Sequence, residues 1–117
     1  RSGLSQEGGV LTSKIDSGQQ WDSPNAWPPL VWWMIHGLDA LGNSVPEAKT
    51  EATQLARTWL RANLLGFNRL GFMAEKWNAF QPGASGGGGE YIPQKGFGWT
   101  NGVVLDLLAT YSFSSLE

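Results

Sequence analysis

Residues 20–29 read Gln-Trp-Asp-Ser-Pro-Asn-Ala-Trp-Pro-Pro, and this segment is the most informative in the chain. Two tryptophans flank an aspartate and an asparagine, and three prolines stiffen the backbone that carries them. Indole rings offer a flat apolar surface to the face of a pyranose, while carboxylate and carboxamide groups bind hydroxyls. The combination therefore indicates a sugar-binding segment.

Two further acids stand between aromatic residues in segments that have no helical period. Glu75 precedes Lys76 and Trp77, and Glu90 follows four glycines. Each carboxylate could act on water or on a sugar hydroxyl, with a pKa set by its aromatic surroundings. The alternatives are a surface ion pair for Glu75 and an ordinary acid on a flexible loop for Glu90.

Other catalytic chemistries find little support in the sequence. His36 is the only histidine and cysteine is absent, so we expect a core or interface histidine and no metal site. The glycines of residues 86–89 lack the Gly-Lys-Ser/Thr ending of a phosphate-binding loop. No Gly-x-Ser-x-Gly segment presents a serine nucleophile.

The seven tryptophans fall into two groups. We expect Trp59, and one of the adjacent pair Trp32 and Trp33, to lie in the core, since they occupy helical segments. The better candidates for stacking on a sugar lie in irregular segments: Trp21, Trp27, Trp77 and Trp99.

Three helices are expected to position these residues. Apolar spacing predicts one over residues 28–41 and a second over 46–65, started by a Ser44–Glu47 capping box and ended by Gly66. The short connection makes these two an antiparallel hairpin. A last helix over 100–113 is capped by Thr100, with Asp106 facing outward. Residues 67–99 form a long glycine-rich loop, a length typical of functional sites.

Composition sets limits on the class of protein. The formal charge of −2 on 117 residues gives no support for nucleic acid as a partner. No segment is long and apolar enough to span a membrane, and the first residues lack the pattern of a secretory signal. The polar start without Met suggests a piece of a longer chain, and the sequence leaves the compartment unknown.

Residues 20–29 resemble the second signature of the family 37 glycoside hydrolases, the trehalases, with every constrained position of that pattern matched. Residues 86–91 and the later Gly-Phe-Gly-Trp-Thr-Asn-Gly of residues 96–102 resemble the same family's glycine-rich block. Residues 2–4 and 8–10 also fit the segment that leads into the signature. The resemblance covers essentially the whole chain.

The resemblance implies an all-α fold that is part of an (α/α)6 toroid with a long glycine-rich active-site loop. It also implies hydrolysis of α,α-trehalose to two glucoses with inversion, by two carboxyl groups roughly 6.5–9.5 Å apart. By position Glu75 corresponds to the general base and Glu90 to an acid that binds substrate hydroxyls. The remaining cleft residues implied by the motifs are Trp21, Asp22, Asn25, Trp27, Phe97 and Trp99. No cofactor or metal is implied.

The family's first signature, its sugar-gripping arginines and its general acid are absent from this chain. We therefore expect the C-terminal segment of a trehalase catalytic domain that is inactive alone and requires the remainder of the chain. Its parts would be a cleft loop (1–29), a helical hairpin (28–66), a catalytic and lid loop (67–99) and a last helix (100–113). Trehalose or glucose is the expected ligand. A non-catalytic sugar-binding module and a helical interaction fragment are the alternatives.

Overall fold

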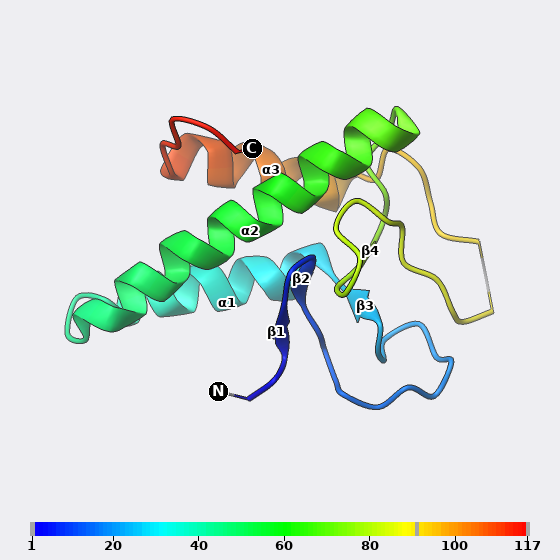
Figure 1. The fold of residues 1–117 in the computed structure, drawn as a ribbon, viewed down its shortest axis with the longest axis horizontal. Helices are drawn as coiled ribbons and strands as arrows, with labels where there is room; N and C mark the ends of the chain where they lie inside the picture. Colours follow the sequence, from blue (N-terminus) through cyan, green and yellow to red (C-terminus); the bar gives the residue numbers. More distant parts are fainter. Residues whose placement is uncertain (1, 91, 117) are drawn as a thin grey trace.

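The computed structural model describes residues 2–90 and 92–116, and within them it contains three helices and four two-residue strands. Helix α1 spans Pro28–Leu41, α2 spans Pro46–Leu70 and α3 spans Gly98–Thr110. α1 and α2 run side by side as a hairpin, and α3 packs against both helices (Figure 1). Of the predicted all-α fold, the described residues thus form a unit of three helices, to which short strands are added.

Two small antiparallel sheets tie the irregular segments to this unit. Strand β1 (Ser5–Gln6) pairs with β2 (Gly9–Val10), and β3 (Asn25–Ala26) pairs with β4 (Trp77–Asn78). In the second sheet Ala26 lies opposite Trp77. Residues 20–29 and the segment that follows α2 are therefore held together by backbone hydrogen bonds, although about fifty residues separate them.

α1 has the predicted limits, and the reason is local. Prolines 28 and 29 fill its first positions, where a backbone N–H would have no acceptor inside the helix. Val31 and Ile35 are fully buried one turn apart, which gives the helix its core-facing side. The chain then turns at Gly42 toward α2.

α2 begins at Pro46 as predicted, but its cap and its C-terminal end differ from the prediction. Its N-terminal cap is Val45, with no side-chain hydrogen bond, so the predicted Ser44–Glu47 capping box is wrong. Gly66 does not end the helix, which continues to Leu70 and closes at Gly71 with φ of 76°.

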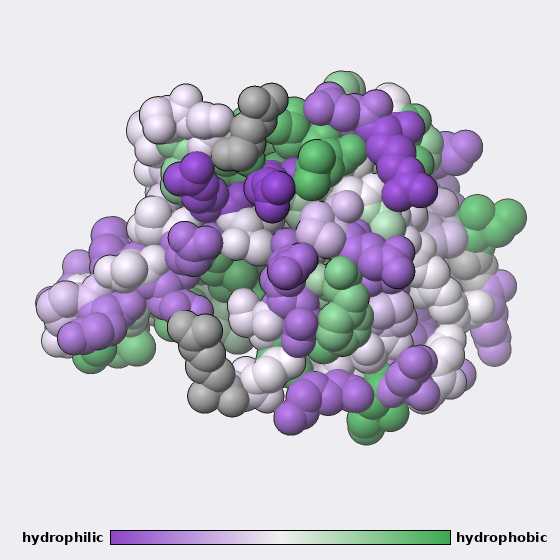
Figure 2. Space-filling view, in the orientation of Figure 1, coloured by the Kyte–Doolittle hydropathy of each residue, from purple (hydrophilic) through white to green (hydrophobic). Residues whose placement is uncertain are grey.

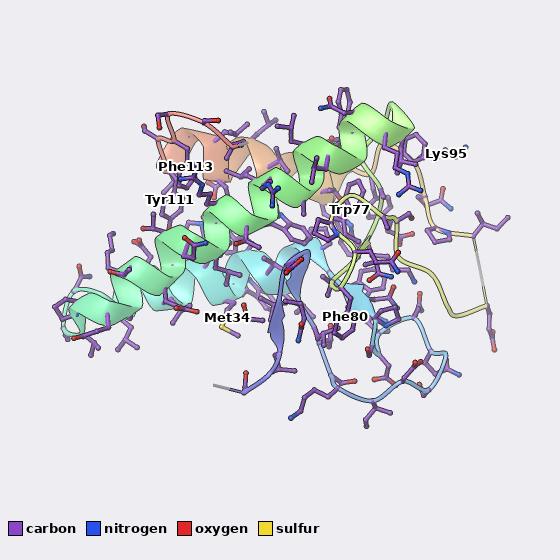
Figure 3. All side chains as sticks on the ribbon, in the orientation of Figure 1. Met34, Trp77, Phe80, Lys95, Tyr111 and Phe113 are labelled. Atoms are coloured by element: carbon purple, nitrogen blue, oxygen red, sulfur yellow. The ribbon has the colours of Figure 1, made fainter. Side chains whose placement is uncertain are left out.

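Gly66 instead has a packing role. A Cβ at this position would lie 2.1 Å from the ring of Trp77, which is fully buried beneath the C-terminal part of α2 (Figure 3). Only glycine permits that approach. Trp77 is therefore a core residue, and the prediction that it stacks on a sugar is wrong.

The core forms between all three helices and the strands. Trp59 is fully buried, as predicted, and it packs so closely on β2 that a Cβ at Gly9 would lie 2.8 Å from its ring. Of the adjacent tryptophans, Trp33 is 64% exposed and Trp32 is partly buried against the core, so neither is a fully buried residue.

α3 starts two residues earlier than predicted, at Gly98, and ends at Thr110. Thr100 is not its cap. It is fully buried inside the first turn and donates a hydrogen bond from Oγ1 to the carbonyl oxygen of Ala74, 2.7 Å away. This bond attaches the start of α3 to the segment that carries Glu75.

Asp106 also departs from expectation, because it faces α1 as well as solvent. Its Oδ2 accepts a hydrogen bond from Trp32 Nε1 at 2.7 Å and lies 2.9 Å from His36 Nε2. These donors hold the pKa of Asp106 below its usual value. His36 is thus a half-buried residue at the α1–α3 contact, which agrees with the prediction of a core or interface histidine.

Candidate functional site

Four of the aromatic residues predicted to line a cleft form one continuous cluster. Trp21 stacks on Trp27 with ring centroids 4.0 Å apart and planes 18° from parallel. The edge of Trp27 meets Trp99 at 5.4 Å, and Phe97 lies 4.7 Å from Trp99. Residues 20–29 supply Trp21 and Trp27, and the start of α3 supplies Phe97 and Trp99. We call this cluster of four rings the aromatic wall.

The members of this wall differ in what they offer a ligand. Trp27 is fully buried, with its Nε1 donating to the carbonyl oxygen of Gln20 at 2.9 Å, so its ring backs the others. Trp21 is 45% exposed, and Trp99 and Phe97 are partly buried. The ring surface that is not buried belongs to these three. Contact of Trp27 with a substrate stays a prediction.

Asp22 closes the loop that precedes β3. Its two carboxylate oxygens accept hydrogen bonds from the hydroxyls of Ser13 and Ser17. These bonds hold the pKa of Asp22 below its ordinary value. The carboxylate thus shapes the loop of residues 13–22, and its predicted contact with a sugar remains untested.

Asn25 joins residues 20–29 to the glycine run, which we define as residues 86–89. It is 1% exposed, and its Nδ2 donates to the carbonyl oxygen of Asp22 at 3.0 Å. Its Oδ1 accepts from the backbone N–H of Gly87 at 3.0 Å. The side chain predicted to bind a sugar therefore already spans the two motifs.

Glu75 is a buried carboxylate on a tightly held backbone. Its side chain is only 4% exposed, and Oε2 accepts a hydrogen bond from the backbone N–H of Gln94 at 2.8 Å. The Glu75 N–H donates to the Gln94 carbonyl oxygen at 3.1 Å, while the Glu75 carbonyl oxygen accepts from Trp99 Nε1 at 2.9 Å. The Gln94 N–H thus orients the carboxylate, while Gln94 and Trp99 hold the backbone of Glu75.

Glu90 lies at the end of the glycine run and is exposed. Gly88 and Gly89 precede it, each with φ of 79°. A hollow of about 370 Å³ lies between residues 16–25 and the glycine run, and neither Glu75 nor Glu90 lines it. A common pocket for the two acids stays a prediction, and Tyr91, which the resemblance includes, lies outside the described residues.

Sequence reasoning gave no role to Lys76, whose side chain is fully buried. Its Nζ lies 4.9 Å over the ring of Trp27 and donates to the carbonyl oxygen of Gly88 at 3.4 Å. Burial lowers the pKa of Lys76, and the charge of Glu75 opposes this effect. No local pattern signals this burial, because the adjacent residues Glu75 and Trp77 are buried as well and burial does not alternate along this segment.

Two other kinds of site have no counterpart among residues 2–90 and 92–116. No group of three or more histidine, cysteine, aspartate or glutamate side chains is placed to hold a metal ion within this part of the chain. Over the same residues, no helix has the length and apolar character needed to cross a membrane.

Comparison with known proteins matches a trehalase family model to residues 1–112. The chain is 51% identical over 105 residues to a trehalase of Tenebrio molitor, an alignment that covers 90% of this chain and 19% of that protein. It is 47% identical over 114 residues to a trehalase of Arabidopsis thaliana, covering 97% and 18%. For a human trehalase the values are 46% over 108 residues, covering 92% and 18%. The chain spans about a fifth of the length of these relatives.

Proposed function

This chain belongs to the trehalase family, and from that membership we propose that it is the C-terminal part of a catalytic domain that hydrolyses α,α-trehalose to two glucoses. In this proposal Glu75 is the general base of an inverting reaction. The general acid and the arginines that grip the sugar come from the remainder of the chain.

The observation that carries the proposal is the way in which Glu75 is held. A general base must point one oxygen at the attacking water while its backbone stays fixed. Glu75 is buried, one of its oxygens accepts from the Gln94 N–H, and its backbone is bonded to Gln94 and Trp99. A carboxylate used only for solubility would not need such restraint.

The aromatic wall supports a sugar as the ligand. Trp21, Phe97 and Trp99 present ring surface close to the segment that carries Glu75. Water would attack one anomeric carbon from the Glu75 side, while the acid supplied from elsewhere protonates the bridging oxygen. An inverting geometry places these two carboxyl groups roughly 6.5–9.5 Å apart. Glu90 would then bind substrate hydroxyls.

Exposed apolar surface on the helices supports the need for the remainder of the chain. Trp33 on α1 is 64% exposed, and Leu105 and Leu108 on α3 are 67% and 50% exposed. Apolar side chains also interrupt the polar surface on the face shown in Figure 2. Large apolar patches mark surfaces that other elements cover. We propose that the other helices of an (α/α)6 toroid do so here.

The test replaces Glu75 in the full-length enzyme. We expect Glu75→Gln to lower kcat by at least about 10²-fold, the scale of general-base loss, with little change in KM.

Azide should restore activity to Glu75→Ala, because azide is a nucleophile that needs no deprotonation. The product should be β-glucosyl azide, because attack inverts the α configuration. Glu47→Gln, an exposed acid in the first turn of α2, is the control and should retain normal turnover. Near-normal kcat in Glu75→Gln, or an α-azide product, would remove Glu75 from this role.

A non-catalytic sugar-binding module is the second candidate, and the exposed ring of Trp21 favours it. Such a module would bind trehalose without the rest of the enzyme. Calorimetry of the 117-residue chain with trehalose separates the two, because a fragment of a catalytic cleft should give no measurable heat.

A further inference from the structure

The glycine run packs directly on residues 18–25. A Cβ at position 86 would lie 2.4 Å from Asn25 Oδ1, and one at position 88 would lie 2.8 Å from the Gly18 carbonyl oxygen. The Gly89 N–H donates to that same Gly18 oxygen at 3.0 Å. Contacts this short exclude any side chain. The glycine run is therefore held in a fixed position against residues 18–25, and we call it the strap. It is not a freely moving lid.

Lys76 lies beneath this strap. Its backbone carbonyl oxygen accepts from the Gly86 N–H at 2.9 Å, and its Nζ donates to the Gly88 carbonyl oxygen. The same ammonium lies over the ring of Trp27. One residue thus contacts the strap at two points and the aromatic wall at a third.

We propose that Lys76 is a positioning residue whose buried ammonium fastens the glycine run to the aromatic wall and so fixes Glu90 for binding of the substrate hydroxyls. This inference rests on the proposed function, in which Glu90 binds substrate. The strap ends at Glu90, and Gly88, which Lys76 bonds, is only two residues before it.

An ammonium suits this role better than a neutral group. It can donate to the Gly88 carbonyl and at the same time be attracted to the face of the Trp27 ring, and both interactions strengthen when water is excluded. The lowered pKa of Lys76 agrees with a site dry enough for this. A methionine of similar length would fill the space and lose both.

The experiment measures kinetics of the full-length enzyme with Lys76→Met, Glu90→Gln and the double variant. We expect Lys76→Met to raise KM about tenfold, the worth of a desolvated cation–π contact and its hydrogen bond, while kcat changes less than about threefold. Because Lys76 acts through Glu90, the double variant should have the same KM as Glu90→Gln alone. Lys76→Arg, which keeps the charge, should restore part of the affinity. Lys95→Met is the matched control, since Lys95 also lies over an aromatic ring, that of Phe72, but is exposed.

Gly88→Ala provides a second route that leaves Lys76 intact, in case Lys76→Met fails to fold. Its φ of 79° and its contact with Gly18 mean that a Cβ must displace the strap, so KM should rise here too. An unchanged KM in Gly88→Ala or in folded Lys76→Met, or KM effects that multiply in the double variant, would overturn the inference. Those outcomes leave the loss of kcat in Glu75→Gln untouched, so failure here is distinct from failure of the proposed function.

Discussion

The helical half of the molecule (α1, α2 and α3) and the loop half (residues 2–27 and 71–97) are held together in different ways. The helices pack through apolar side chains, and polar side chains join them at a few points, such as Tyr111 Oη donating to Asp39 Oδ1 at 3.1 Å. The loop half depends on backbone hydrogen bonds between distant residues. Gly8 donates to Ala79, and Ala79 donates to Pro24.

The difference follows from where each backbone finds its partners. A helix satisfies its own N–H and C=O groups, whereas an irregular segment must find partners elsewhere or stay exposed to water. The loop half therefore forms only when all its segments are present together. That interdependence gives Glu75 and Glu90 a defined setting, although neither residue lies in a helix or strand.

The two halves meet at Gly66 of α2, and the first prediction breaks that contact. Gly66→Ala places a Cβ within 2.1 Å of the buried Trp77 ring, which cannot move into empty space. We expect a loss of about 3 kcal/mol in the free energy of unfolding, at the upper end for an overpacked core. Denaturant unfolding of the chain followed by tryptophan fluorescence measures it.

Gly37→Ala is the matched control for this prediction. Gly37 is an exposed glycine within α1, and no atom lies within 4 Å of a Cβ built there. The helix should gain about 0.5–1 kcal/mol because alanine is the better helix former. If Gly66→Ala gains stability as Gly37→Ala does, helix propensity governs the two sites and the close contact with Trp77 has no energetic role.

These two glycines also show where sequence reasoning succeeds and where it fails for the fold. The limits of α1 could be predicted because prolines at its start and apolar spacing along it are local signals. A glycine within a helical pattern can mark either the end of the helix or a close contact with another element. Only the position of Trp77, eleven residues further along the chain, decides between them at Gly66.

At the candidate site, the residue types were predictable but their surroundings were not. Trp21, Trp27 and Trp99 were predicted as candidates for stacking on a sugar because they lie in irregular segments, and in the structure Trp27 contacts both of the other rings. Their burial, and that of Lys76, depends on β3 pairing with β4, a contact between segments far apart in sequence. The partners of Asp106 on α1, some seventy residues away, were beyond local patterns for the same reason.

The second prediction concerns the helical half alone. Tyr111→Phe removes the hydrogen bond to Asp39 and should cost about 1 kcal/mol at neutral pH. Burial and the Asp39 carboxylate raise the pKa of Tyr111 to about 12 from an ordinary value of 10. The folded state thus keeps the phenol protonated where the unfolded state ionises, and the wild-type chain loses this stabilisation as the pH rises from 10 toward 12.

The gap in unfolding free energy between wild type and Tyr111→Phe should therefore narrow above pH 10. Denaturant titrations at pH 8, 10 and 11 measure it, with Ser112→Ala as a control for an exposed neighbour. A gap that stays constant across this range would mean that Tyr111 ionises equally easily in both states.

The smallest effect is expected in the loop half, at Asp22. Asp22→Asn leaves one of the two serine hydroxyls without its acceptor, because an amide nitrogen cannot accept a hydrogen bond. The bonds are at the surface, so we expect the melting temperature to fall by only about one to two degrees at pH 7.

Since the pKa of Asp22 is lowered in the folded state, its stabilisation is complete above the ordinary value of 3.8 and disappears as the pH falls through the folded value. The difference in melting temperature between wild type and Asp22→Asn should thus close in strong acid, while the exposed Asp16→Asn in the same loop should show none at pH 7. A difference that persists at low pH would show that the loop depends on the shape of the side chain at position 22. A large difference at pH 7 would mean that a few strong hydrogen bonds, and not many weak ones, hold this loop.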